Sequence, residues 1–387
     1  MPDFDASFWL LLGRCVVLVL GAAAILATLL PLLKEEAWWI RVFDFPRLQI
    51  IGVALLSALA AALVHLESWP GGWVAMGAMA AVGAYQLYRV IPYTPFVRKQ
   101  AADATLLGPD KHLSLAVMNV LQYNKQAQRA LGVIQACDPD VIMAVETDQW
   151  WLDQLRPLEK THPYTCHEPL ENTYGLLFFS RLPLRDARIE YLLDDDIPSV
   201  HAHVQIPGTD TWVRLYGLHP KPPAPAESKT STKRDAELLL VGKAIEEKDE
   251  PTIVFGDMND VAWSHTSELF RRVSGLLDPR VGRGMLPTFH AEYRLLRWPL
   301  DHVFISPDFK VANIERLPYV GSDHFPICIK VSYEPHAKAE QEQNAEQADA
   351  EDEQEAQEKI EKGFEEEEQQ EAEEQRTPAE AALKLSH

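Results

Sequence analysis

The sequence contains few cysteines and no internal repeat, and these two absences exclude several classes of protein. Only 4 of the 387 residues are cysteine. Their wide separations match neither a zinc motif nor the framework of a small disulfide-rich domain, and they leave the redox compartment open. These cysteines are Cys15, Cys137, Cys166 and Cys328.

Basic residues are also scarce. The net charge is −21, and residues 337–387 hold 18 acidic against 5 basic residues, which leaves about −9 for residues 100–336. A protein that grips long duplex DNA usually presents a face rich in Lys and Arg, so this partner is disfavoured, although it is not excluded. The basic residues that do stand close together are Lys229, Lys233, Arg234, Arg280 and Arg283.

Charge is almost absent from three long apolar runs, at residues 8–33, 48–66 and 72–90. Each run is long enough to cross about 30 Å of hydrocarbon as a helix, so we expect three transmembrane helices. Three buried helices of a soluble protein are the alternative, but such helices normally keep a polar face. A cleavable signal peptide fits poorly, because the amino terminus is acidic and two further runs follow the first.

The orientation of these helices follows from the flanking charges and aromatic rings. Lys and Arg concentrate in the loop at residues 34–47 and again at residues 89–99, whereas the opposite side has only Arg14. The positive-inside rule therefore places the region after residue 99 in the cytoplasm. Aromatic residues that favour the membrane interface stand at the ends of the runs, namely Trp38, Trp39, Trp69, Trp73 and Tyr93.

Large apolar residues are nearly missing from the carboxyl-terminal segment, residues 336–387, which is rich in Glu, Gln and Ala. Such a composition cannot form a core of its own, so we expect a disordered tail or a solitary solvated helix. A polar linker is expected at residues 100–111, between the membrane region and a domain at residues 112–335.

Within this domain, strand-like apolar runs repeatedly end in a polar residue. Any one such turn is weak evidence for a site, because Asp, Asn and Ser are good turn formers. Six ends in a fixed order are hard to explain as chance, and they suggest one active site built from several strands. In chain order the polar residues are Asn119, Glu146, His219, Asp257 with Asn259, Asp301, and Asp323 with His324.

Residues 112–333 resemble the endonuclease/exonuclease/phosphatase superfamily, and within it the membrane-tethered bacterial proteins of unassigned substrate. The motifs that carry this resemblance are Pro139-Asp140-Val141, the run from Gly175 to Pro183, Phe255-Gly256-Asp257-Met258-Asn259, Thr288-Phe289 and Leu300-Asp301-His302-Val303. The resemblance implies a multi-pass protein of the bacterial inner membrane. It also implies an α+β fold, a four-layer α/β/β/α sandwich, with amphipathic helices expected near residues 125–137, 232–247 and 267–274.

The resemblance also implies a divalent metal ion, Mg²⁺ or Mn²⁺, held by oxygen ligands. Glu146 would be the principal ligand, with Asn119 beside it and Asp323 completing the set. Asp257 would orient or deprotonate the attacking water, and Asn259 would donate a hydrogen bond to a phosphoryl oxygen.

Histidines complete the implied constellation. His324 would contact the phosphate and be oriented by Asp301, and His219 would act near the leaving group or the phosphate. For His219 the alternative is a partly buried residue that packs locally. Weaker expectations for substrate contacts fall on Arg234, Asn124, Tyr174 and Trp263, although Arg234 could instead be a solvated helix residue and Trp263 could only pack.

Together these features predict a membrane-anchored, metal-dependent hydrolase of a phosphodiester or phosphomonoester. The acidic balance favours a lipid-borne or small phosphoester over nucleic acid, and a nuclease is the alternative. Two alternatives from another class are a catalytically silent membrane protein that binds a phosphate-bearing partner, and a scaffold that works through its acidic tail. Deletion of everything after Pro335 is expected to disable a scaffold and to spare an enzyme.

Overall fold

The chain forms two units, Met1–Val97 and Arg98–His387. The computed structural model describes residues 6–106 and 110–384, and describes side chains as far as Glu373.

The first unit is entirely helical. Two of its helices are long and apolar enough to cross a membrane by length and composition alone, Ala6–Leu32 and Gly72–Tyr93. A third crossing is possible if Trp38–Asp44 and Arg47–Leu63, which meet at a bend of 71°, count as one span. The elements are α1 (Ala6–Leu29), η1 (Leu30–Leu32), α2 (Trp38–Arg41), η2 (Val42–Asp44), α3 (Arg47–Leu63), η3 (Leu66–Ser68), α4 (Gly72–Val90) and η4 (Ile91–Tyr93).

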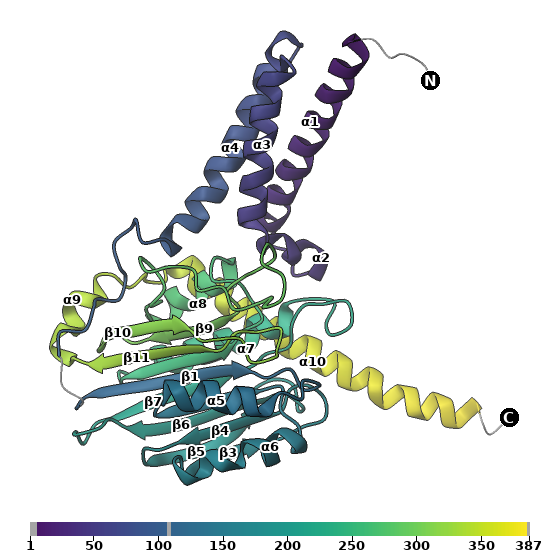
Figure 1. Ribbon diagram of the computed structural model, residues 1–387. Coiled ribbons are helices and arrows are strands. Elements are labelled where there is room, and N and C mark those ends of the chain that lie inside the picture. Colours follow the sequence, from purple (N-terminus) through teal and green to yellow (C-terminus); the bar gives the residue numbers. More distant parts are fainter. Residues whose placement is uncertain (1–5, 107–109, 385–387) are drawn as a thin grey trace. The chain divides into compact units, whose positions relative to one another are not determined.

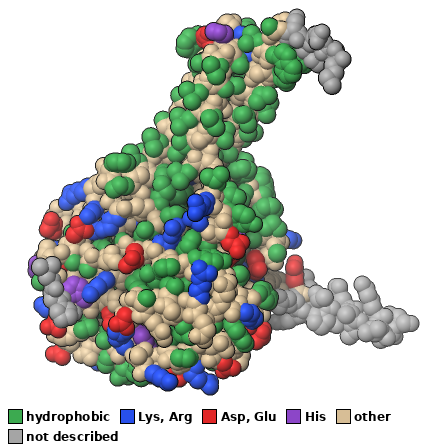
Figure 2. All heavy atoms as spheres, in the orientation of Figure 1, with side chains coloured by type: hydrophobic (Ala, Val, Ile, Leu, Met, Phe, Trp, Pro, Cys, Tyr) green, Lys and Arg blue, Asp and Glu red, His purple; other side chains and the backbone are tan. Residues whose placement is uncertain are grey.

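Apolar side chains of this unit face outward as well as inward. Leu63 and Val74 expose 80% and 76% of their surface, and Figure 2 shows hydrophobic side chains over the visible face of the helices. Within the unit, α1, α3 and α4 meet through small apolar clusters, such as Ala24 with Ala54 and Val82. An outward apolar surface is what lipid requires and water opposes, so this arrangement argues against the alternative of buried soluble helices.

The second unit contains two sheets packed face to face, with helices on their outer faces (Figure 1). The six-stranded sheet has the order β10-β11-β1-β2-β4-β3, and the five-stranded sheet has the order β5-β6-β7-β8-β9. The strands are β1 (His112–Asn119), β2 (Val141–Val145), β3 (Tyr164–Glu168), β4 (Leu176–Ser180), β5 (Leu184–Tyr191), β6 (Pro198–Gln205), β7 (Trp212–Leu218), β8 (Thr252–Asp257), β9 (Asp301–Ile305), β10 (Phe309–Arg316) and β11 (Ile327–Tyr333).

Three apolar layers hold this unit together. The central layer lies between the sheets and includes Val117, Phe178 and Phe255. A second layer joins the six-stranded sheet to α5 (Ala127–Cys137), α6 (Gln149–Leu155) and η5 (Arg156–Lys160), and a third joins the five-stranded sheet to α7 (Thr232–Glu246) and α8 (His265–Ser274). The expected four-layer α/β/β/α sandwich is therefore confirmed, and its three expected helices correspond to α5, α7 and α8.

The segment expected to be a linker is instead attached to this unit. Ala101 is fully buried, and Asp103 pairs with Val311 of β10. The backbone N–H groups of Thr105 and Leu106 donate to the buried carboxylate of Glu334 at 2.8 and 3.2 Å. The polar composition of this segment did not predict these contacts, because they are made mainly by backbone groups. Residues 107–109 of the expected linker lie outside the described residues.

The expectation of a disordered or solitary carboxyl-terminal tail is wrong for the described part. After η6 (Pro335–Ala337) and α9 (Lys338–Glu342), residues Ala350–Lys384 form the single long helix α10. Ala356 and Ile360 of α10 are buried in the apolar layer over α7 and α8. This tail cannot form a core by itself, but it completes a core whose other side chains come from earlier in the chain.

Glu334 offers a test of how the entry segment is held. Burial raises the pKa of a carboxyl group, but donors from Thr105, Lys310 and Leu106 outweigh this effect and lower the pKa of Glu334 to about 2. A lowered folded-state pKa adds stability above the unfolded-state pKa, and this stability is lost as the pH falls toward 2. We therefore expect Glu334→Gln to lower the Tm by several degrees at pH 7, and by less at pH 3.

The matched control is Glu340→Gln, because Glu340 is exposed in the same region. Thermal unfolding of the full chain, followed by circular dichroism at both pH values, measures the difference. An equal loss at pH 7 and pH 3 would contradict an ionised Glu334 in the folded state.

Candidate active site

The polar strand ends converge because of the register of the two sheets. Parallel β1 and β2 align Asn119 with Val145, so Asn119 and the following Glu146 lie at one edge. In the other sheet, parallel β7 and β8 align Leu218 with Gly256, which places His219 beside Asp257 in the same way. Antiparallel β9 starts at this edge, with Asp301 opposite Asp257.

Backbone geometry at this edge is restrictive. Gly256 has φ of 148°, and a Cβ there would stand 1.9 Å from the carbonyl oxygen of Leu218. Glycine is therefore required where β8 passes its neighbour before presenting Asp257. Glu146 and Asn259 have φ of 58° and 50°. Positive φ is uncommon for Glu, whereas Asn adopts it readily, so only Glu146 is held in a costly backbone conformation at this edge.

Asn119 joins the two sheets through its side-chain amide. Its Nδ2 donates to Glu146 Oε1 at 2.6 Å and to Asp257 Oδ2 at 3.0 Å. Glu146 follows β2 of the six-stranded sheet, whereas Asp257 ends β8 of the five-stranded sheet. A single amide thus holds two carboxylates from different sheets next to one another.

The carboxylates of Asp257 and Asp301 meet the ring of His324. His324 Nδ1 lies 2.8 Å from Asp301 Oδ2 and 3.5 Å from Asp257 Oδ2. All three residues are buried. The His324 ring is also 4.9 Å from that of Phe289, whose backbone forms a bridge with the histidine.

Burial and charge set the protonation of this cluster. Burial alone would lower the pKa of His324, but the carboxylates of Asp257 and Asp301 outweigh it and raise the pKa to about 10. His324 is therefore an imidazolium at neutral pH, with Nδ1–H donating to Asp301. Burial raises the pKa of Glu146 to about 7 and also raises that of Asp257.

His219 lies in the same pocket in a different state. It exposes only 2% of its surface, and burial lowers its pKa to about 4, so the ring is neutral at pH 7. Its Nδ1 has no hydrogen-bond partner among the described residues. The ring lies 5.4 Å from that of Tyr174, whose hydroxyl donates to Glu227 Oε2 at 2.8 Å. His219 therefore keeps an unused polar atom beside Asp257, which local packing alone does not explain.

Arg234 lies beneath the turn after β8 and does not face the pocket. Its side chain is 3% exposed, and Nη1 donates to the backbone carbonyl of Asn259 at 2.9 Å. The alternative of a solvated helix arginine is wrong because buried partners use its guanidinium, whereas the contact with Asn259 agrees with an arginine that supports the site. Asn259 in turn donates from its backbone N–H to Asp257 Oδ1, and from Nδ2 to the carbonyl of Pro220, each at 3.0 Å.

Three other expected residues contribute to the framework around the pocket. Asn124 is buried and donates to the carbonyls of Val120 and Val320, so it ties the loop after β1 to the turn that carries His324. Trp263 exposes 1% of its surface and packs, which excludes it as a wall of a substrate groove. Asp323 adjoins His324, and its carbonyl accepts from the N–H of Ala291 at 2.6 Å.

Sequence reasoning missed two acidic residues that support the site. Asp260, directly after the Asp257 turn, lies 3.3 Å from Arg234 Nη2, and its backbone carbonyl lies 2.9 Å from His302 Nε2. Asp235 is fully buried and accepts two hydrogen bonds from Arg234. The only signal in the sequence was the neighbouring charge in Arg234-Asp235, which is also common on solvated helices.

The donor set fits a hard divalent cation. Asp257, Asp301 and His324 bring their polar atoms within 4.8 Å of one another, but the protonated His324 ring has no free lone pair, so the carboxylates and the adjoining Asn119 and Glu146 are the oxygen donors for such an ion. Asp301 Oδ1 is buried without a hydrogen-bond partner among the described residues. Buried carboxylates with a pKa raised by desolvation become ionised readily when a cation binds. The ligands expected from the sequence, Glu146, Asn119 and Asp323, thus lie around Asp257, Asp301 and His324.

A comparison with solved structures finds several that are similar to part of this chain. Humanized D. rerio TDP2 is 15% identical, with a TM-score of 0.49 over 58% of this chain and 100% of that chain. A mannosyl-6-phosphatase of Bacteroides thetaiotaomicron is 18% identical, with a TM-score of 0.47 over 57% and 100%. A protein of Beutenbergia cavernae titled endonuclease/exonuclease/phosphatase is 18% identical, with a TM-score of 0.46 over 58% and 72%.

No curated protein matches the chain. A family model does match, over residues 116–324, which is more than half of the sequence and includes every strand end that builds the pocket. This chain therefore belongs to the Endonuclease/Exonuclease/phosphatase family.

Proposed function

We propose that the protein is a membrane-anchored, divalent-metal-dependent phosphoesterase. The observation that carries this proposal is the buried cluster in which Asn119 joins Glu146 to Asp257, and Asp257 meets the His324–Asp301 pair. Hydrolysis of a phosphoester needs a base or an orienting group for water, positive charge at the phosphoryl oxygens and a neutral donor near the leaving group. Asp257 and the His324 imidazolium supply the first two, and neutral His219 beside this cluster supplies the third.

In this proposal each side chain has one task. Asp257, held by the Asn119 amide and the Asn259 N–H, orients the attacking water and accepts its proton. The imidazolium of His324 stabilises negative charge on the phosphoryl group, and Asp301 fixes the orientation of the ring. Neutral His219 presents a ring nitrogen toward the leaving-group side of the site.

Asn259 keeps a donor for a phosphoryl oxygen, because its Nδ2 has two hydrogens and the hydrogen bond to Pro220 uses one. Glu146, Asn119 and Asp323 would hold Mg²⁺ or Mn²⁺. When bound, this ion shields the phosphoryl oxygens and lowers the pKa of a ligated water.

The substrate proposed is a lipid-borne or small phosphoester. A loop beside His324 carries exposed apolar side chains, with Tyr293, Leu295 and Leu296 exposing 56%, 85% and 48% of their surfaces. Exposed Arg294 lies among them. Apolar rings and chains next to a cation suit the headgroup boundary of an anionic bilayer.

The basic residues that might have held a nucleic acid backbone are engaged inside the fold. Lys233 and Arg234 are buried and paired with carboxylates, and Arg280 is fully buried against Asp278. Few cations of the expected basic group therefore remain to neutralise a row of phosphates, which supports the ranking of a nuclease as the alternative. A cytoplasmic catalytic unit on the inner membrane remains our expectation for the location.

Asp257→Asn tests the proposed base. The substitution keeps the shape of the side chain, but it removes the proton acceptor and one of the two oxygens that accept from Asn119 Nδ2 and the Asn259 N–H, so we expect kcat to fall by about 10²- to 10⁴-fold. The matched control is Asp153→Asn on α6, where the carboxylate is 54% exposed and pairs with the exposed Arg156. Residual activity near that of the control, with an unchanged melting curve, would contradict the role of Asp257.

A phosphoester panel tests the substrate class. We expect the purified full chain, in detergent micelles with Mg²⁺ or Mn²⁺, to hydrolyse a phospholipid, sphingomyelin, inositol phosphate or nucleotide faster than DNA. A chelator should abolish turnover and added metal should restore it. Faster cleavage of single- or double-stranded DNA would favour the nuclease, and no turnover of any phosphoester by the folded protein would favour the catalytically silent alternative.

A further inference from the structure

The acidic helix α10 packs closely against α7. Its Ala356 and Ile360 enter the apolar layer that also holds Leu239 and Phe270. A Cβ at Gly363 would stand 2.3 Å from the Cβ of Ala236 on α7, so this close approach requires glycine. Figure 1 shows the first part of α10 running beside α7 and its later turns extending away from the sheets. The helix is thus a built part of the unit.

Charge complementarity fixes α10 in register. Acidic residues of the helix pair with basic or polar groups on α7, on α8 and in the loop before α7. These contacts are Arg272–Asp352 at 2.8 Å, His265–Glu355 at 2.6 Å, Thr230–Glu366 at 2.8 Å, and Lys233–Glu367 and Lys243–Glu353, which are also in contact. Asp352, Glu353 and Glu367 therefore meet positive charge within the fold, and the expectation of a solvated tail fails for this part of the helix.

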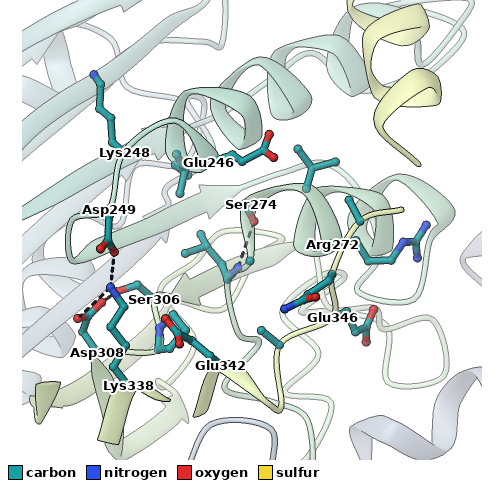
Figure 3. Close-up of a pocket in the computed structure, with 18 of the residues that line it drawn as sticks. Glu246, Lys248, Asp249, Arg272, Ser274, Ser306, Asp308, Lys338, Glu342 and Glu346 are labelled. Atoms are coloured by element: carbon teal, nitrogen blue, oxygen red, sulfur yellow. Dashed lines mark hydrogen bonds and ion pairs between the residues drawn. The ribbon is translucent and has the colours of Figure 1, made fainter. Parts of the chain in front are cut away.

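The chain leading to α10 also covers a second surface. A cavity of about 480 Å³ lies between the ends of α7 and α8 and residues 338–353, away from the active site. Figure 3 shows Lys338 pointing to Asp249 and Asp308 across this cavity. Lys338 thus pairs with two of the carboxylates that line the cavity, so the cavity indicates how the tail is attached.

In one buried contact of α10 the charges are reversed, because α10 supplies the basic residue and α7 supplies the acidic one. Lys359 exposes only 6% of its surface, and its Nζ lies 3.0 Å from Oδ2 of the fully buried Asp235. The same carboxylate accepts from Arg234 Nη2 at 2.7 Å through Oδ1, and from Thr266 Oγ1 at 2.8 Å through Oδ2. Asp235 therefore joins the tail helix to Arg234.

Arg234 carries this connection to the reacting groups. Its Nη1 donates to the carbonyl of Asn259, and the N–H of Asn259 donates to Asp257 Oδ1. Asn259 has a left-handed backbone with φ of 50°, which turns the chain so that its N–H and its carbonyl meet these two partners. Four successive contacts thus link Lys359 to Asp257, all among groups with little access to water, where a displaced charge is costly.

We propose that α10 is a positioning element of the active site, in which Lys359 acts through Asp235 and Arg234 to fix the turn from Asp257 to Asp260. The expected effect on kcat rests on the proposed phosphoesterase function, whereas the expected effect on the turn from Asp257 to Asp260 does not. Lys359 lies outside the segment matched by the family model, so the catalytic unit of this protein extends to α10. The simpler alternative is that α10 only covers an apolar surface.

Lys359→Met separates the two possibilities, because it keeps an apolar stem against α7 and removes the cation. We expect kcat to fall by about 10- to 100-fold with KM changed less than about twofold, since small displacements of a reacting group are costly in rate. Lys359→Arg should restore most of kcat. The control is Lys362→Met, one turn along the same helix, where the lysine is exposed.

A second readout does not depend on turnover. Amide hydrogen exchange of residues 257–261, measured in the full chain by mass spectrometry, should quicken in Lys359→Met and in the milder Lys359→Gln, but not in Lys362→Met. A lower Tm with unchanged kcat and unchanged exchange of this turn would overturn the proposal. If the wild type hydrolyses nothing, the proposed function fails while the exchange result still decides the role of Lys359.

An independent observation concerns two cysteines that face each other. The sulfur atoms of Cys137, at the end of α5, and Cys328, in β11, lie 2.7 Å apart, and both residues carry free thiols. The hydrogen bond between them lowers the pKa of Cys137, and such a thiol is the better nucleophile. Cys328 follows His324 by four residues, so a covalent link here would tie α5 to the strand that leaves the active site.

We infer that Cys137 and Cys328 form a redox-active dithiol that closes to a disulfide by exchange with a small-molecule disulfide. With oxidised glutathione, the Cys137 thiolate attacks one sulfur and releases one glutathione thiolate. Cys328 then attacks the mixed disulfide and releases the second, so two thiols and one oxidised glutathione give one protein disulfide and two glutathiones. The sequence alone showed no such pair, because 191 positions separate the two cysteines.

Glutathione buffers of graded ratio test this inference on the full chain. After alkylation and digestion without reductant, we expect a linked Cys137–Cys328 peptide whose yield rises with oxidised glutathione, while Cys15 and Cys166 stay unlinked. Cys328→Ser should instead accumulate the glutathione adduct of Cys137. Free thiols at both positions under fully oxidised glutathione, in the folded protein, would overturn the inference.

Discussion

The structure depends on keeping the carboxylate of Asp257 buried at the point where two sheets meet. Buried carboxylates are unfavourable unless they are paired and hydrogen-bonded, and this one is held by Asn119 from the first sheet, by His324 and by the N–H of Asn259. The sandwich therefore does more than bring strand ends together. Each sheet supplies polar groups that lower the free-energy cost of burying the charged side chains of the other sheet.

The same constraint explains the division of protonation states in the pocket. His324 faces two carboxylates and stays charged, whereas His219 is buried with fewer compensating charges and stays neutral. Two imidazoles of equal chemistry thus become a cation and a neutral group through their surroundings. A phosphoesterase can use this difference, because charge accumulates on the phosphoryl oxygens while the leaving oxygen needs a donor.

The tail changes the meaning of the overall charge. Read as a free acidic segment, residues 336–387 predicted a solvated appendage that could be deleted without loss of turnover. In the structure, the helix pairs with Lys233, Lys243 and Arg272 and buries Lys359 against Asp235. Deletion after Pro335 would uncover an apolar layer and leave Asp235 without one of its cations, so loss of turnover would not by itself indicate a scaffold.

The sequence by itself determined the family, the sandwich, the polar strand ends and the apolar character of the first hundred residues. These features are local, because a strand ends where its own residues change and an apolar helix shows in its own composition. That Asn119, Asp257 and His324 belong to one site was expected from the series of polar strand ends, and the resemblance implied their roles.

Tertiary structure alone decided the contacts of α10, the attachment of residues 98–106, the burial of Arg234 and Trp263, and the pairing of Cys137 with Cys328. Each of these depends on complementarity between segments far apart in the chain. For α10, two buried apolar residues are enough to attach the helix, because α7 and α8 supply the other side chains of the apolar layer. Composition gives the residues of a segment, whereas only the fold shows which other residues they contact.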